Sequence, residues 1–80
     1  MKNLINPKAE VLEFFFRNRP KDISINRLCT KFDEIPYDTL FGFCQELEFD
    51  NWIVMIDNVS WRMTIPQAAR YREQWKSSWK

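Results

Sequence analysis

The segment that most constrains the fold is residues 35–56, where a helical pattern changes abruptly into a strand pattern. Apolar side chains recur there at i, i+3, i+4 and i+7, which predicts one buried stripe on a helix, formed by Leu40, Phe43, Cys44 and Leu47. The unbroken apolar run of residues 52–56 then predicts a strand. Asn51 lies between the two patterns, and Asn is the non-glycine residue that best tolerates a left-handed backbone. We therefore expect a helix that stops sharply at Asn51 and leads straight into a strand.

The N-terminal part predicts two further helices joined by a short extended segment. Asn6 followed by Pro7 is typical of a helix start, and the apolar pattern continues to about residue 17. Residues 22–24 are expected to be extended, with Ser24 capping a second helix over residues 25–32. Only three or four residues separate this helix from the next one, which is a helix-turn-helix arrangement.

The C-terminal part predicts a hairpin and a last helix. Residues 57–58, Asp-Asn, lie between two β-prone runs, so we expect a tight turn there. Thr64 is expected to cap a helix of residues 66–79. The predicted fold is a single α+β domain of residues 1–80, mainly α with a small β-hairpin, in the order helix-strand-helix-helix-strand-strand-helix.

Three passages in this order resemble the winged helix-turn-helix family, in particular its small stand-alone regulators. They are SINRLCTKFDEIPYDTL, LEFDNWI and WRMTIPQAARYRE, which together cover about residues 24–73. In the second passage Asn51 stands where the family usually has Gly. The resemblance implies a winged-helix fold and a default role in binding DNA, with the third helix in the major groove and the hairpin wing on the backbone.

The charge distribution does not suit that default role. Residues 1–32 carry seven bases and three acids, and residues 58–80 carry five bases and one acid. Residues 33–57, which include the third helix, carry seven acids and no Lys or Arg. Affinity for DNA rests largely on Lys and Arg neutralising phosphates, so an acidic third helix favours a different partner.

The third helix nevertheless provides the candidate binding residues. By the resemblance, Tyr37, Asp38, Phe41, Gly42 and Gln45 would meet DNA, but only Gln45 is a usual base-reading residue. Tyr37 and Phe41 are spaced i, i+4 and are expected to form an exposed aromatic pair beside acids, which is typical of a protein-binding surface. The predicted partner-binding residues are Tyr37, Asp38, Phe41, Gln45 and Glu48. The structural alternatives are that the acids near the helix start complement its dipole and that Phe41 packs under the second helix.

The last helix carries two further candidate surfaces. Tyr71, Trp75 and Trp79 lie on one side, and the hypotheses are docking on the Phe-rich first helix or self-association into a homodimer. Its basic residues, with Arg62 of the hairpin, are candidates for contact with nucleic acid or an acidic partner: Arg62, Arg72, Lys76 and Lys80. The alternative for that basic stripe is a solvated helix face.

The composition argues against catalysis. The chain has no His and a single Gly, so it has no imidazole base and no glycine-rich phosphate loop. Its two cysteines, Cys29 and Cys44, fall on apolar helix positions and are expected to be reduced and buried. We expect no catalytic residues, metal, cofactor or small-molecule substrate. No apolar run reaches membrane-spanning length and the N-terminus is no secretory signal, so we expect no membrane contact and a cytoplasmic location.

Two functional hypotheses follow from the sequence. The favoured one is a non-enzymatic, small regulatory binding module that contacts a protein partner through the acidic, aromatic third helix. The alternative is a DNA-binding transcription regulator that reaches phosphates through the basic first and last helices.

Overall fold

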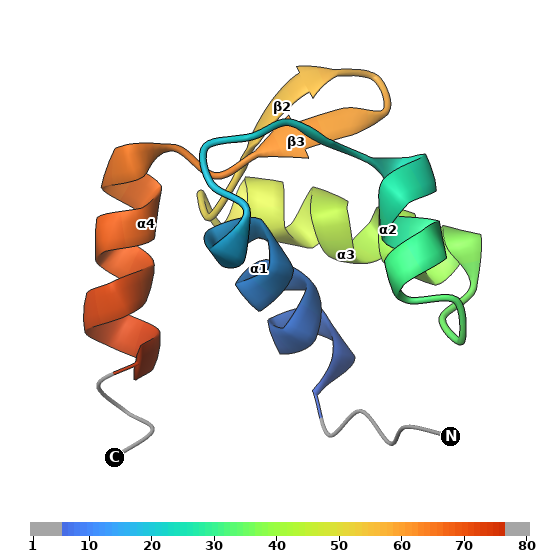
Figure 1. The fold of residues 1–80 in the computed structure, drawn as a ribbon, viewed down its shortest axis with the longest axis horizontal. Helices are drawn as coiled ribbons and strands as arrows, with labels where there is room; N and C mark the ends of the chain where they lie inside the picture. The colour runs from blue at the N-terminus through green and yellow to red at the C-terminus, as the bar shows by residue number, and fades with distance from the viewer. Residues whose placement is uncertain (1–5, 77–80) are drawn as a thin grey trace.

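The computed structural model describes residues 6–76 of the 80-residue chain, and the side chains of residues 6–74. The elements follow in chain order (Figure 1): α1 Pro7–Arg17, β1 Ile23–Ser24, α2 Ile25–Lys31, α3 Tyr37–Phe49, β2 Val54–Asp57, β3 Ser60–Arg62 and α4 Ile65–Tyr71. A π-helical turn, Arg72–Lys76, extends α4. The predicted α+β class is confirmed, and the elements have the predicted order.

The three strands form one antiparallel sheet in the order β1-β3-β2, so β3 is central. Trp61 of β3 lies opposite Ile23 on one side and Met55 on the other. Opposed residues in an antiparallel pair share a face, so these three side chains lie together on the face that carries the fully buried Trp61 ring. A bulge between Met55 and Asp57 interrupts the pairing of β2 with β3.

The core is built from one apolar face of each helix, from Ile23 of β1 and from the hairpin. α1 contributes Val11, Leu12 and Phe15, and α3 contributes Leu40, Cys44 and Leu47 of its predicted stripe. Phe43, the fourth predicted member, is half-buried and packs against the core. Burial of each large apolar side chain contributes about 1.5–3 kcal/mol, so this set is the main stabilising term. The predicted caps are confirmed: Asn6 Oδ1 accepts from the Ala9 amide at 3.2 Å, and Ser24 Oγ accepts from the Arg27 amide at 3.2 Å.

The turn after α3 is a Schellman motif centred on Asn51, which has a φ of 68°. The Asn51 amide donates to the Glu48 carbonyl, and the Trp52 amide donates to the Leu47 carbonyl, both at 2.9 Å. The predicted left-handed terminator is therefore confirmed. The strand begins two residues later than predicted, because Trp52 and Ile53 are buried in the turn before β2 starts at Val54.

α4 holds this turn through two side chains. Gln67 closes the capping box of α4 with Thr64, and its Nε2 also donates to the Asn51 carbonyl at 3.1 Å. Arg70 Nη1 donates to the Asp50 and Asn51 carbonyls, each at 3.1 Å, and its guanidinium lies 3.8 Å from the centre of the Trp52 ring. The carbonyls at the end of α3, which carries no base of its own in its last turn, thus receive donors from α4.

The conformation of Asn51 generates a stability prediction. Asn51→Ala is expected to lower the free energy of unfolding by about 1 kcal/mol, because alanine pays a larger steric cost at positive φ. Asn51→Gly keeps the turn without that cost and should remain at least as stable as the alanine variant. Urea unfolding of the three proteins measures the difference. An alanine variant as stable as the parent chain contradicts the strain argument.

Candidate functional site

The candidate site is the outward face of α3. Leu40, Cys44 and Leu47 turn into the core, which leaves the opposite side of this 13-residue helix in solvent. Of the predicted binding residues, Asp38 and Gln45 are exposed, Tyr37 is 48 % exposed, and Glu48 is half-buried. The structure therefore leaves these four side chains accessible along one helix.

Phe41 differs from the prediction. It is half-buried and packs edge-on against Trp61, with 5.4 Å between ring centres, while Tyr37 lies 6.1 Å away on its other side. The expected pair of two exposed rings is therefore wrong for Phe41, since its ring joins α3 to the central strand. Tyr37 is the accessible member of the pair.

Among the side chains of residues 6–74, the most exposed large apolar one is Phe49, at 90 %, which is not among the predicted binding residues. Phe49 lies one turn after Gln45 and outside the apolar stripe of α3, and this mismatch with the stripe was the available signal. It borders an open hollow of about 480 Å³, which is lined by Lys8, Gly42, Gln45, Glu46, Phe49 and Asp50.

The negative charge of α3 and of the segments on either side of it is largely unpaired within the described residues. Six of the seven acids between residues 33 and 57 are exposed, and Glu48 is half-buried. Among the described side chains only Glu46 of this group forms a salt bridge, with Lys8 of α1 at 2.8 Å. α3 itself carries no base. The exposed rings of Tyr37 and Phe49 thus lie on a negatively charged helix.

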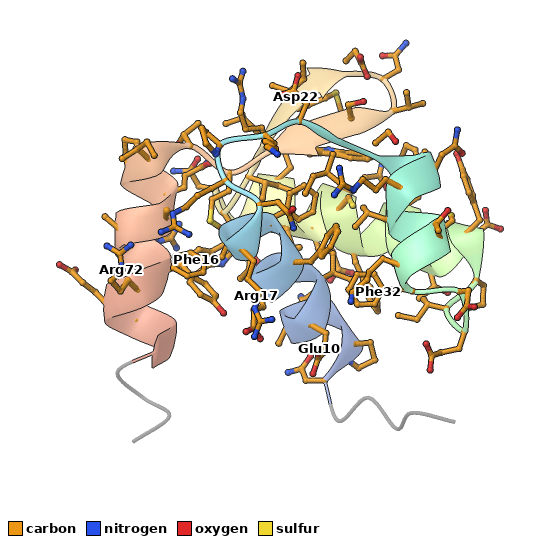
Figure 2. The ribbon with its side chains drawn as sticks, viewed as in Figure 1. Glu10, Phe16, Arg17, Asp22, Phe32 and Arg72 are labelled. Atoms are coloured by element: carbon orange, nitrogen blue, oxygen red, sulfur yellow. The ribbon has the colours of Figure 1, made fainter. Side chains whose placement is uncertain are left out.

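The predicted basic contact residues are not brought together by the described part of the chain. Arg62 Nε lies 3.3 Å from Oδ1 of Asp22, which lies beside the hairpin (Figure 2). Arg72 is exposed, with its guanidinium 5.7 Å from the Phe16 ring. Lys76 has its backbone in the π-helical turn but its side chain lies outside the described residues, as does the whole of Lys80.

Tyr71 does not belong to a self-association face. It is 2 % exposed, and its ring lies 4.5 Å from that of Phe16, which fills the space between α1 and α4 (Figure 2), and 6.4 Å from that of Trp52. Burial, with a smaller contribution from Glu13, raises the pKa of the Tyr71 hydroxyl. The docking alternative thus holds for Tyr71. The side chain of Trp75 and all of Trp79 lie outside the described residues.

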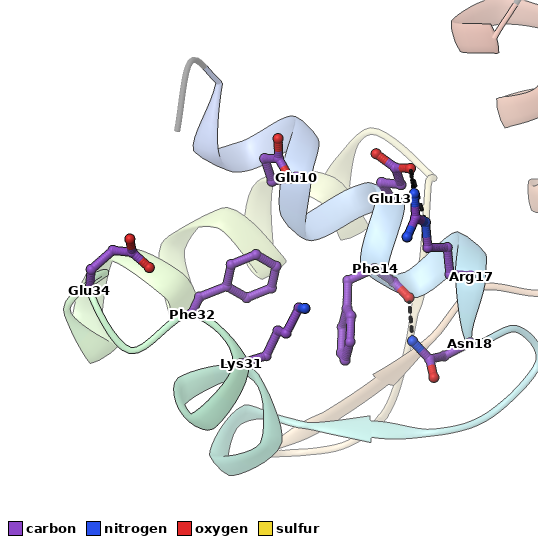
Figure 3. A pocket seen from close by; sticks show the side chains of 8 residues that line it. All are labelled: Glu10, Glu13, Phe14, Arg17, Asn18, Lys31, Phe32 and Glu34. Atoms are coloured by element: carbon purple, nitrogen blue, oxygen red, sulfur yellow. Dashed lines mark hydrogen bonds and ion pairs between the residues drawn. The ribbon is translucent and has the colours of Figure 1, made fainter. Parts of the chain in front are cut away.

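A second hollow, of about 400 Å³, lies between α1 and the end of α2 (Figure 3). Its aromatic wall is the edge-on pair Phe14 and Phe32, with ring centres 5.8 Å apart. Arg17 and Glu13 on its rim form a salt bridge at 2.8 Å. The other charged lining residues are Glu10, Lys31 and Glu34. Both charge signs line this hollow, so its charge selects for no one class of ligand.

Both cysteines are free thiols, and burial raises the pKa of Cys44 to about 12, so its thiol stays protonated at neutral pH. Between residues 6 and 76, no three His, Cys, Asp or Glu side chains gather in a way that could hold a metal ion. Within the same range, no helix has the length and apolar character needed to cross a membrane.

Comparison of the chain with protein-family models, with curated proteins and with solved structures finds no match.

The different environments of Tyr37 and Phe41 generate a prediction. Phe41→Ala is expected to cost about 2 kcal/mol of unfolding free energy, because it removes a ring that packs on Trp61. Tyr37→Ala should change the unfolding free energy by less than about 0.5 kcal/mol, because its ring is half in solvent. Thermal or urea unfolding of the two variants provides the comparison. Equal losses would show that the two rings are equally part of the core.

Proposed function

We propose that the chain is a winged-helix domain that acts as a small, non-enzymatic regulatory module and contacts a protein partner through the outward face of α3. The fold part of the proposal is supported by the order of the elements and by the sheet order β1-β3-β2, with α2 and α3 separated by a short turn. The hairpin β2–β3 then corresponds to the wing, and Asn51 takes the position of the usual Gly.

The observation that supports a protein partner is the exposed Phe49 ring on a helix without bases. A ring that is 90 % exposed gains about 1.5–3 kcal/mol when a partner covers it. Aromatic side chains of this kind are enriched among the residues that dominate protein interfaces. The rim of Asp38 and Asp50 adds attraction for a basic partner and speeds its association.

The same charges oppose the approach of DNA. A duplex carries one phosphate charge per 1.7 Å or so of axis, and a helix inserted into its groove brings its own charges within a few ångströms of them. Each acid on α3 then adds repulsion instead of releasing a counterion. Arg62, the base on the proposed wing, is already paired with Asp22.

The alternative is a DNA-binding transcription regulator, and the observation in its favour is Gln45. This side chain is exposed near the middle of α3, and Gln pairs with adenine through two hydrogen bonds. The bases for phosphate contact would then come from α1 and from the end of the chain.

A salt titration with random-sequence duplex DNA separates the two functions. We expect no saturation below about 100 µM duplex at 0.15 M salt, because α3 supplies no base for phosphate contact. Tight binding that weakens steeply between 50 and 200 mM salt rejects the protein-contact proposal and supports the alternative.

A paired capture experiment tests the protein surface itself. The tagged chain is used to capture partners from its source cell, followed by mass spectrometry. Phe49→Ala is expected to weaken the captured partner's binding about tenfold or more, as truncation of a central interface ring does. Ile65→Ala is the matched control, because Ile65 is also exposed, at 61 %, but lies on α4. Equal loss in both variants, or in neither, contradicts a site centred on Phe49.

A further inference from the structure

Gly42 is the single glycine of the chain, and nothing within the fold requires it. It lies in the interior of α3, and its backbone does not have a positive φ. A Cβ built at this position meets nothing within 4 Å. Glycine weakens a helix interior relative to alanine, so the chain carries a cost here that neither its backbone conformation nor its packing explains.

The space above Gly42 belongs to the hollow beside Phe49. Gln45 lies three residues after Gly42, and Phe49 lies seven residues after Gly42. The three positions therefore lie on one face of α3. Asp38 precedes Gly42 by one turn on the same face. A bare backbone segment is thus flanked by an exposed ring at one end and an acid at the other.

A missing side chain on an exposed helix face lets another helix approach closely. The distance between two packed helix axes, about 8–10 Å, depends on the side chains at their point of contact. Glycine at that point gives the shortest approach and leaves room for one apolar side chain of the incoming helix next to the Phe49 ring.

The charges around the hollow indicate which residues should flank the apolar stripe of a partner helix. Asp38 and Asp50 are exposed and form no salt bridge with any side chain described by the structure. Lys8, the one base that lines the hollow, is held by Glu46 at 2.8 Å, and Arg70, which donates to the Asp50 carbonyl, lies outside the lining. A partner helix with Lys or Arg flanking its apolar stripe complements this arrangement.

We propose that α3 docks a basic amphipathic helix of its protein partner, which crosses α3 at Gly42 and places an apolar side chain against Phe49. This inference rests on the proposed function and names the class of partner for the same surface. The incoming helix is recognised by its close approach to the backbone at Gly42 and by its attraction to the acids at both ends of the contact.

Fluorescence anisotropy with three labelled helical peptides tests this inference. Each 16-residue peptide carries the same leucine stripe, flanked by lysine, glutamine or glutamate. We expect saturable binding of the lysine peptide and none of the glutamate peptide. Because lysine peptides also adhere to acidic surfaces without a defined site, the decisive comparison uses variants of unchanged charge.

Gly42→Leu fills the hollow and should lower the affinity for the lysine peptide at least tenfold. Ala69→Leu is the matched control, since Ala69 is a small helix residue on α4 that is exposed, and its substitution should leave the affinity unchanged. Gly42→Ala should raise the melting temperature by roughly 4–8 °C and lower the affinity for the lysine peptide several-fold. A variant that is more stable but binds less well separates docking from folding.

The outcomes distinguish this inference from the proposed function. If Gly42→Leu binds the lysine peptide as tightly as the parent chain, or if no peptide binds saturably, helix docking at Gly42 is overturned. Gly42-dependent self-association in place of peptide binding, measured by ultracentrifugation, also overturns it. The proposed protein-contact function survives these results if Phe49→Ala still releases the captured partner, and it falls separately if the chain binds duplex DNA tightly.

Discussion

The turn at Asn51 is the constraint on which the rest of the arrangement depends. It ends α3 with two Schellman hydrogen bonds, and only Trp52 and Ile53 separate Asn51 from the start of β2. Gln67 and Arg70 of α4 donate to the carbonyls of this turn, so one short segment receives contacts from the helix before it and the helix after it. The orientation of α3 relative to the sheet is therefore fixed by backbone geometry and by hydrogen bonds, and the outward face of α3 is presented on a rigid support.

α3 consequently has two faces with different requirements. Leu40, Cys44 and Leu47 are buried in the core, and their burial fully explains why these positions are apolar. Part of the outer face also has a structural account, because Asp38 complements the helix dipole at the N-terminal end and Glu46 pairs with Lys8. The exposed Phe49 ring, the carboxylate of Asp50 and the missing side chain at Gly42 have no role in folding that the described contacts show, although the Asp50 backbone belongs to the turn that Arg70 holds. These are the features on which the proposal of a basic helical partner is built.

The sequence predicted the elements well because the starts of α1, α2 and α4 carry a local signal: Asn6, Ser24 and Thr64 all cap as expected. α3 begins after Pro36 without a side-chain cap. The site was predicted less well, since helical periodicity assigns a face but not the neighbours that cover it. Phe41 lies at the border of the apolar face, and whether it is covered depends on Trp61, twenty residues later. Tyr71 likewise depends on Phe16, more than fifty residues earlier. Phe49 is not predicted by periodicity, because it lies outside the apolar stripe of α3 and the stripe alone marks the buried face.

The outer edge of the sheet carries a final consequence. β2 is an edge strand with exposed Met55 and Ile56, and neither Lys nor Pro interrupts it. Strands of this composition recruit identical neighbours and seed fibrils when they are flat. The bulge between Met55 and Asp57 breaks the spacing of the free amides and carbonyls, and Asp57 adds a negative charge at the end of the strand. The inserted residue and the charge of Asp57 are thus the features of this edge that oppose its pairing with the same strand of a second molecule.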